Sequence, residues 1–424
     1  MGAFVYVELG TSIQKSGGDL AYLCHVKWYS IAFSYVGVGG ILNNPVVTAI
    51  GAQTFSEYIT KGLKIRFTQE HHNYWAQKLI SFSLLMPLTY LNFFSVKKFV
   101  SRFQVVASFF TLLASSLVIC TGFYWLIFKG ETQNFQNVFA NTTYAPGKIV
   151  SALFAGLFSY DGWDVLNYGI EEVSNPKRNM PLAILIGLSL VAAFYLSLNI
   201  SYYTVLNIPQ LLESNAVAVT FAQKTLGSFQ YVMPFAISIL LIGAINSTIF
   251  ASSRYLYAAA RSGYLPSFIS CTNKEQDSPR TALFVHLLLT IVFSFAGDLN
   301  QLINYSSFAT WSQRAFSILA LLYIRYKHIK VHPHAVKMPI FMPILFVAIC
   351  ISLLVITVAQ DFTTSIVSLS FILGGWLAYL IFKWDRTLQT IEWYKRKAAQ
   401  LNERAAVYTQ IVFNGIIDSE TKET

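Results

Sequence analysis

Residues 158–164 read FSYDGWD and place two carboxylates and a glycine within an otherwise apolar stretch. Gly162 lacks a Cβ, and Asp161 and Asp164 are unfavourable residues in the interior of a helix. Backbone at membrane depth must satisfy its own hydrogen bonds unless it is packed in protein or lines a cavity. Either the helix breaks here, presenting N–H groups to an anion and carbonyls to a cation, or it continues through one tolerated glycine.

A second unusual charge is Arg314, in the segment TWSQRAF of another apolar run. An arginine in the middle of a span costs at least about 2.5 kcal/mol on the mildest insertion scale. We therefore expect an intramembrane ion pair, with Asp161 as the candidate partner of Arg314. The alternative is a shifted helix from which Arg314 reaches the membrane interface. For Asp161, the alternative to a role in a binding site or in this pair is exposure to water at a helix mouth.

The composition indicates the class of protein that carries these groups. Of the 424 residues, 54% are hydrophobic and only 12% are charged, whereas a soluble domain has about 25% charged residues. The four cysteines are scattered without a CxxC pair, so neither a disulfide framework nor a zinc site is expected. The chain contains no nucleophile–base set and no phosphate loop, and its basic residues form no nucleic-acid patch. We expect a membrane protein that is not an enzyme and needs no cofactor or metal.

Ten apolar runs are long enough, or nearly so, to cross a bilayer core that needs about 20 residues. Residues 1–13 are apolar but too short to span. The chain should therefore be an all-α polytopic membrane protein, with a transmembrane domain over 1–385 and a C-terminal tail over 386–424. The predicted spans are Trp28–Ile50, Trp75–Val96, Phe99–Phe128, Lys148–Ile170, Pro181–Leu206, Tyr231–Ala260, Thr281–Ala296, Gln301–Tyr323, Pro339–Ala359 and Thr363–Phe382.

The basic residues orient these spans. Twenty-two of the 30 lysines and arginines fall in one set of alternate loops and in the tail, and seven fall in the other set. Because cytoplasmic loops carry the excess of basic residues, the first set and the C-terminus should be cytoplasmic. The segment from 175 to 181, NPKRNMP, is predicted to be a tight cytoplasmic turn. The tail from Asp385 to Ile417 fits either a helix on the inner membrane surface or a solvated tail.

Five stretches in fixed order carry a resemblance to a known family. They are 6–23 (YVELGTSIQKSGGDLAYL), 95–104 (SVKKFVSRFQ), 156–184 (GLFSYDGWDVLNYGIEEVSNPKRNMPLAI), 245–266 (INSTIFASSRYLYAAARSGYLP) and 301–311 (QLINYSSFATW). Together they resemble the L-type amino acid transporters, the light subunits of heteromeric amino acid transporters in the amino acid–polyamine–organocation superfamily. The resemblance covers about residues 1–385. The forms FSYDGWD, YYTVL and AVAVTFA are most similar to the y+L-type branch, which exchanges cationic for neutral amino acids.

The resemblance implies a LeuT-type fold of two inverted five-helix repeats, with substrate held between two broken helices, the first and the sixth. By that scheme this chain lacks helix one and part of helix two, and we would expect the 424-residue chain alone to transport little. The implied function is transport of large neutral and cationic amino acids across the plasma membrane by exchange through alternating access. The alternative is a truncated, transport-inactive form with a regulatory or interaction role.

The resemblance also implies the site residues. The family's broken segment matches Phe158, Ser159, Tyr160, Asp161, Gly162 and Trp163; there the phenylalanine closes over the substrate and backbone carbonyls take its ammonium group. Asn43 and Asn44 fall at the level of the family's pocket, where they either bind substrate or join helices. For Asn246, Ser247 and Ser252 we expect helix packing.

Two further predictions concern the outer surface and partners. Asn141 begins an Asn-x-Thr sequon in a predicted external loop and is a candidate glycosylation site. The family's light subunits join a heavy-chain glycoprotein through a cysteine in the loop between helices three and four. Here the corresponding loop from Thr60 to Tyr74 contains no cysteine, so a disulfide is excluded there and a non-covalent association is left open. The expected partners are thus amino acid substrates, the lipid bilayer and such a glycoprotein.

Overall fold

The structure is a computed structural model. It describes residues 1–15, 17–63, 65, 70–94, 97–136, 142–167, 170, 173–214, 216–276, 278–297, 299–333, 335–384 and 387–417. The chain forms two compact units, each assembled from three separate stretches. Unit 1 comprises 1–43, 143–191 and 300–401, and unit 2 comprises 44–142, 192–299 and 402–424. Three helices, α8, α13 and α16, contain a unit boundary.

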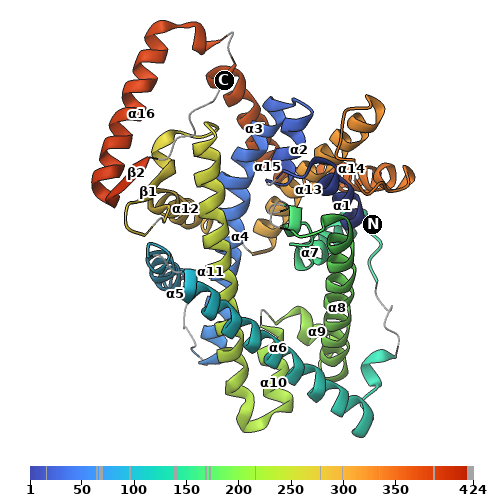
Figure 1. Cartoon of the computed structure of the whole chain (residues 1–424). Helices are drawn as coiled ribbons and strands as arrows, with labels where there is room; N and C mark the ends of the chain where they lie inside the picture. Colours follow the sequence, from blue (N-terminus) through green and yellow to red (C-terminus); the bar gives the residue numbers. More distant parts are fainter. Residues whose placement is uncertain are drawn as a thin grey trace. The chain divides into compact units, whose positions relative to one another are not determined.

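In unit 1, α1 (Gly2–Ile13) is a short helix whose residues are almost all buried, and it lies beside α14 (Phe341–Gln360) (Figure 1). Ala3 and Val7 of α1 pack against Ile170, Met180 and Ile184 in one apolar cluster. Its elements are α1 (Gly2–Ile13), α2 (Asp19–His25), α3 (Tyr29–Gly37), η1 (Val38–Asn43), α7 (Pro146–Ser159), η3 (Val165–Asn167), the first half of α8 (Pro176–Val205), most of α13 (Leu299–Tyr326), α14 (Phe341–Gln360), α15 (Phe362–Ala378), η7 (Tyr379–Lys383), η8 (Leu388–Thr390) and the first half of α16 (Glu392–Phe413).

Unit 2 is a helical bundle in which α4 packs along α11, with α5 and α12 beside them. One apolar cluster joins these helices through Ala52, Leu85, Leu88, Ile249 and Leu283, among others. The unit's elements are α4 (Asn44–Gly62), α5 (Glu70–Leu91), α6 (Lys97–Phe128), η2 (Gln133–Phe135), the second half of α8, α9 (Ile208–Leu212), α10 (Val217–Thr225), η5 (Gly227–Tyr231), α11 (Val232–Arg261), η6 (Ser267–Ser270), β1 (Cys271–Asn273), α12 (Arg280–Phe293), the second half of α16 and β2 (Gly415–Ile417).

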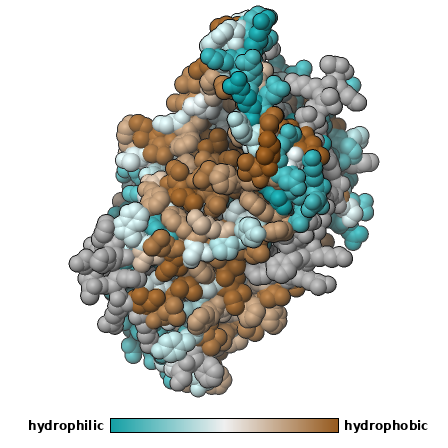
Figure 2. Space-filling view, turned by 90° about the vertical axis from the view of Figure 1, so that its left-hand side faces the viewer, coloured by the Kyte–Doolittle hydropathy of each residue, from teal (hydrophilic) through white to brown (hydrophobic). Residues whose placement is uncertain are grey.

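Within the described residues, six helical stretches are long and apolar enough to cross a membrane. They are Tyr29–Gly62, Val105–Phe128, Pro176–Val205, Val232–Arg261, Phe341–Gln360 and Ser365–Lys383. Figure 2 shows apolar residues over much of one face of the protein, as expected of a surface in contact with lipid. α7 and α12 are apolar but shorter, at 14 residues each. The prediction of a helical, multi-pass membrane protein is confirmed at this level.

Two local predictions are wrong. The segment 175–181 is not a tight turn: α8 already begins at Pro176, because the preceding Asn175 adopts φ 47° and Pro176 suits the first position of a helix. Pro181 therefore lies inside α8. Lys148–Ile170 is not one continuous span either, because α7 ends at Ser159.

The entry from α3 into α4 shows a distortion that the sequence pattern did not reveal. Residues Val38–Asn43 form a π-helical segment just before Pro45. A proline cannot donate to the carbonyl one turn earlier and its ring crowds that turn, so the ladder widens locally. Gly39 and Gly40, which lie in this segment before Pro45, were the only hint of the distortion that the sequence offered.

The C-terminal tail is largely helical and returns to unit 2. α16 covers Glu392–Phe413, and β2 then pairs antiparallel with β1, with Cys271 opposite Ile417 and Asn273 opposite Gly415 (Figure 1). Neither strand was predicted, because three-residue strands give too little alternation to be read from sequence. The proposed boundary at residue 385 between membrane domain and tail stays a prediction.

Candidate functional site

The candidate site in unit 1 is the break that follows α7. The helix ends at Ser159, and residues 160–164 form a turn before the short 3-10 segment Val165–Asn167. Gly162 has φ 95°, a conformation that residues with a Cβ rarely adopt, and no neighbouring atom lies within 4 Å of the position that a Cβ would take. The glycine is therefore required by the backbone and not by close packing. The intact-helix alternative is wrong, and the helix end releases backbone groups that a continuous helix would have paired.

Arg314 of α13 points at this break. Its Nη2 lies 2.5 Å from Asp161 Oδ1 and 3.5 Å from Asp164 Oδ2. The Arg314 side chain is 3% exposed, whereas 46% of the Asp161 side chain and 10% of the Asp164 side chain are exposed. The structure thus brings together the two residues expected to pair, and it adds Asp164 as a second carboxylate.

Aromatic rings complete the surroundings of the guanidinium. Its Cζ lies 4.8 Å from the ring centre of Trp163 and 4.9 Å from that of Trp311, within the range of a cation–π interaction. The Nε of Arg314 is buried and has no hydrogen-bond partner among the described residues. A weakly hydrated, planar cation suits such a setting better than an ammonium group would. The guanidinium of Arg314 is therefore held by two carboxylates and two aromatic rings, while its Nε–H has no acceptor among the described residues.

A third carboxylate, that of the buried Asp19, is bound to Gln313, the residue next to Arg314. Tyr6 donates its hydroxyl to Asp19 Oδ1 at 2.6 Å, and Gln313 donates to Asp19 Oδ2 at 3.1 Å. The Tyr6 ring also meets Trp163 edge to face at 5.0 Å between centres. α1, α2, α13 and the break are thus tied through buried side chains. Asp19 and Tyr6 were not singled out from the sequence, because nothing local marks an aspartate at the start of a short helix as the partner of a tyrosine 13 residues away.

Asn167 anchors the far end of the break. Its side-chain amide donates to the carbonyl of Asp164 at 3.0 Å, and its Oδ1 accepts the hydroxyl of Tyr22 at 2.8 Å. Both Asn167 and Tyr22 are fully buried. This arrangement fixes the turn from the α2 side and holds Asp164 in position against Arg314.

The other predicted site residues lie as follows. Ser159, Asp161 and Gly162 are exposed, and Phe158, Tyr160 and Trp163 are half-buried. Ser159 donates its hydroxyl to the carbonyl of Ala155 at 3.0 Å, a contact along its own helix. Their roles in substrate binding stay predictions.

Asn43 and Asn44 make helix-joining or intrahelical contacts. The Asn43 side chain accepts a hydrogen bond from Ser306 of α13, and the Asn44 carbonyl accepts the hydroxyl of Thr48 at 2.9 Å. The first contact is the one expected if Asn43 joins helices. Asn246 accepts from Asn92 at 2.7 Å, which confirms its predicted packing role. Asn141, the predicted glycosylation site, lies outside the described residues.

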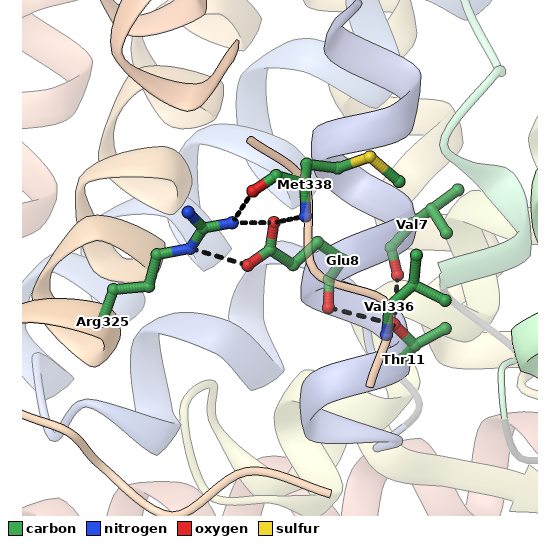
Figure 3. Close-up of polar contacts among 6 residues, drawn as sticks. All are labelled: Val7, Glu8, Thr11, Arg325, Val336 and Met338. Atoms are coloured by element: carbon green, nitrogen blue, oxygen red, sulfur yellow. Dashed lines mark hydrogen bonds and ion pairs between the residues drawn. The ribbon is translucent and has the colours of Figure 1, made fainter. Parts of the chain in front are cut away.

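A second buried ion pair in unit 1 was missed by sequence reasoning (Figure 3). Arg325 Nε donates to Glu8 Oε1 at 2.7 Å, and Arg325 Nη2 contacts Glu8 Oε2 as well. Glu8 Oε2 also accepts the Met338 N–H at 2.9 Å, and Thr11 Oγ1 accepts the Val336 N–H at 3.0 Å. Because Glu8 and Thr11 share one face of α1, they hold the extended segment 335–339 along that helix (Figure 3).

This clamp, formed by Glu8, Arg325 and the Met338 backbone, gives the buried Glu8 three donors from two elements. The sequence did hint at this ion pair: Glu8 lies in an apolar segment, and a charged residue there needs a partner, as was argued above for Arg314. Tyr6, on the opposite face of α1, meets Trp163 of the break, and Val7 belongs to the apolar cluster that contains Ile170, against which Trp163 packs. The clamp therefore fixes the helix that supports the candidate site.

Comparison with known proteins decides the family. The family described as "Amino acid permease" matches residues 1–378, which is most of the chain. The chain belongs to the amino acid permease family. This permease is 49% identical over 414 residues to "Amino acid transporter protein 6" of Caenorhabditis elegans, covering 98% of this chain and 79% of that protein.

Two human relatives agree. The permease is 34% identical to the "Cystine/glutamate transporter" over 97% of its own length and 80% of that protein. It is 33% identical to the "b(0,+)-type amino acid transporter 1" over 90% of its length and 77% of that protein. The expected relation to the light-subunit amino acid transporters is confirmed, and with it the prediction that the chain is a transporter and not an enzyme.

Proposed function

We propose that this permease exchanges amino acids with large neutral or cationic side chains across the plasma membrane by alternating access. Amino acid transport follows from the family; exchange and the substrate class are the proposal. The observation that carries it is the break after Ser159, where a helix end, the half-exposed Asp161 and the buried Arg314 meet. Released backbone groups at such a break suit the charged ammonium and carboxylate of an amino acid.

The charges around the break support a cationic side chain in the substrate. Arg314 is the positive group in the network described above, which also contains the carboxylates of Asp161, Asp164 and Asp19. Asp161 contacts Arg314 through Oδ1, and nearly half of its side chain remains exposed. A substrate ammonium or guanidinium can therefore approach Asp161 without displacing Arg314. A large neutral side chain can instead lie against the half-buried rings of Phe158 and Trp163.

The test is counterflow in proteoliposomes that contain the purified full chain. Vesicles loaded with unlabelled leucine or lysine should accumulate radiolabelled leucine or lysine, and empty vesicles should not. Asp161→Asn should lower lysine counterflow much more than leucine counterflow, because only lysine offers a second cationic group. Glu213→Gln removes an exposed carboxylate of unit 2 and serves as the matched control.

The outcomes separate the parts of this proposal. Equal accumulation in loaded and empty vesicles would exclude exchange. Equal losses of leucine and lysine in Asp161→Asn would refute the assignment of Asp161 to side-chain selection while leaving exchange intact. A monodisperse protein with no accumulation of either amino acid would contradict the proposed exchange. It would agree with the expectation that this chain alone transports little, and it would favour the interaction role.

We further propose that any heavy-chain glycoprotein associates without a disulfide, since the Thr60–Tyr74 loop, where the family's linking cysteine would lie, has no cysteine. Non-reducing gels of co-expressed proteins should then show no adduct through this loop, while affinity capture in mild detergent retains both chains. A reducible high-mass band that vanishes on mutating one of the four cysteines would contradict this.

The proposed orientation places the C-terminus in the cytoplasm, on the basis of the asymmetry of lysines and arginines between loops. An epitope tag after Thr424 should react with antibody only in permeabilised cells. Labelling of intact cells would reverse the topology.

A further inference from the structure

α16 carries different chemistry on two faces. Residues spaced by three or four along a helix lie on the same face. Asn402, Ala406, Thr409 and Phe413 follow this spacing and form one face, here called the docked face. Trp393, Lys397, Leu401, Arg404, Tyr408 and Ile411 follow it about half a turn away and form the outer face.

The docked face is bound to unit 2 through specific contacts. Asn402 accepts the Ser267 N–H at 3.1 Å and donates to the Ser267 hydroxyl at 2.7 Å. The carbonyl of Phe413 accepts from Asn273 and from Arg280, each at 3.2 Å. The Phe413 ring meets Phe93 and Phe284, each at 6.0 Å between centres. These contacts fix the rotation of α16 about its axis, and so they fix which side chains face outward.

The outer face is apolar and basic. Trp393, Leu401, Tyr408 and Ile411 are each between 62% and 72% exposed. Lys397 and Arg404 lie among them, and Lys397 Nζ lies 4.8 Å from the Trp393 ring centre. The two glutamates of the helix point elsewhere by the same spacing, and Glu392 pairs with Arg396 at 3.3 Å. A helix with such an apolar and basic face is typical of one lying in a membrane interface.

Both ends of α16 are held next to membrane-spanning helices. Its N-terminus follows the apolar stretch Ser365–Lys383 after eight residues, which reach at most about 3.6 Å each. Its C-terminal half is docked on Ser267–Asn273, in the connection between α11, a candidate span, and α12. Each end of α16 is therefore tethered close to the end of a candidate span.

We propose that the outer face of α16 binds the anionic lipid surface of the cytoplasmic leaflet, with Leu401, Tyr408 and Ile411 in the interface and Lys397 and Arg404 at the headgroups. This inference rests on the proposed cytoplasmic orientation. Basic residues near an anionic leaflet are attracted to it, and tryptophan and tyrosine favour the headgroup level. The docked face simultaneously holds the connection between α11 and α12, so lipid binding and the position of this connection are linked.

The test uses the full chain in nanodiscs and a depth-sensitive fluorophore. An NBD label on Ile411→Cys, in a Cys120→Ser background because Cys120 is exposed, reports the outer face. The same label on Glu403→Cys reports a neighbouring polar face. With 30% phosphatidylserine, the label at 411 should shift to the blue and be quenched by doxyl-labelled lipid, whereas the label at 403 should stay in water.

Charge variants test the headgroup contacts. Lys397→Gln and Arg404→Gln should each shift the membrane-inserted fraction at 411 by about fivefold in its equilibrium constant, equivalent to roughly 1 kcal/mol per basic residue. The shift should vanish in pure phosphatidylcholine and at high salt, where the attraction is screened. Arg396→Gln is the matched control, because this arginine pairs with Glu392 away from the outer face. Monodisperse elution of each variant establishes that it is folded.

Three results would overturn the proposal. Equal quenching at 411 and 403, or none at either, would mean that the outer face does not meet lipid. Shielding at 411 that appears only when cytosolic protein is added would assign the face to a soluble partner. Shielding that grows with the number of chains per bilayer area would assign it to a second copy. The epitope tag after Thr424 reports the orientation of the chain independently of the fluorophore. A reversed topology can therefore be told apart from an outer face that does not bind lipid.

Discussion

Removing Arg314 should destabilise this permease far more than neutralising Asp161. The Arg314 side chain is 3% exposed and faces Asp161 at 2.5 Å and Asp164 at 3.5 Å. Breaking a buried pair by deleting one partner costs roughly 3–5 kcal/mol, because the remaining charge is left uncompensated. Arg314→Leu leaves Asp164, whose side chain is only 10% exposed, in this situation, so its cost should fall within that range.

Asp161→Asn is a milder change. Its side chain is 46% exposed, so water already screens much of its interaction with Arg314. The guanidinium keeps Asp164 and the faces of Trp163 and Trp311. The loss should therefore stay near the lower end of the ~1.5–3 kcal/mol that a charge-assisted hydrogen bond contributes. Adding Asp164→Asn to Arg314→Leu should restore more stability than adding Asp161→Asn.

The measurement is the free energy of unfolding in mixed micelles, titrated with denaturing detergent, for each single and double variant. Arg396→Gln is the control, because its side chain is 79% exposed and a surface change should stay within about 0.5 kcal/mol. Equal losses in Arg314→Leu and Asp161→Asn would refute the burial argument. Losses that simply add, with no coupling between Arg314 and either aspartate, would refute the ion pair itself.

Other variants test the clamp, the break and the tail. Glu8→Gln should cost roughly 3–5 kcal/mol of unfolding free energy, because it leaves Arg325 half-buried without its carboxylate; full stability would contradict the clamp. Gly162→Ala should cost about 1–3 kcal/mol through backbone strain alone and lower counterflow, whereas unchanged values would mean that the turn relaxes. Burial raises the pKa of the Cys271 thiol, so maleimide should label it slowly at neutral pH. Gly415→Ala would place a Cβ 2.5 Å from Cys271 Sγ; the displaced strand should speed labelling, which mass spectrometry of the Cys271 peptide can follow.

The sequence by itself determined the membrane class and the family, and it marked the place where a break was one of two alternatives. These properties are local: apolar runs are counted along the chain, and Gly162 between two aspartates is unfavourable in a helix wherever the rest of the protein lies. It also indicated that Arg314 needs a partner, since the cost of a charge in lipid does not depend on the fold. The same argument applied to Glu8 would have anticipated the clamp.

Only the tertiary structure decided which groups meet. Asp19, Tyr6 and Asn167 reach the break from separate segments, and no periodicity in the chain encodes their distances. α8 begins at Pro176 and not at Pro181. Either proline suits the first turn of a helix, and only the left-handed conformation of Asn175 selects Pro176. The tail shows the same limit: its spacing allowed either an amphipathic surface helix or a solvated tail. Only the contacts of Asn402 and Phe413 determine which face of the helix is covered and which is left for another surface. Such choices depend on side chains far apart in sequence, whose packing is settled only when the whole chain folds.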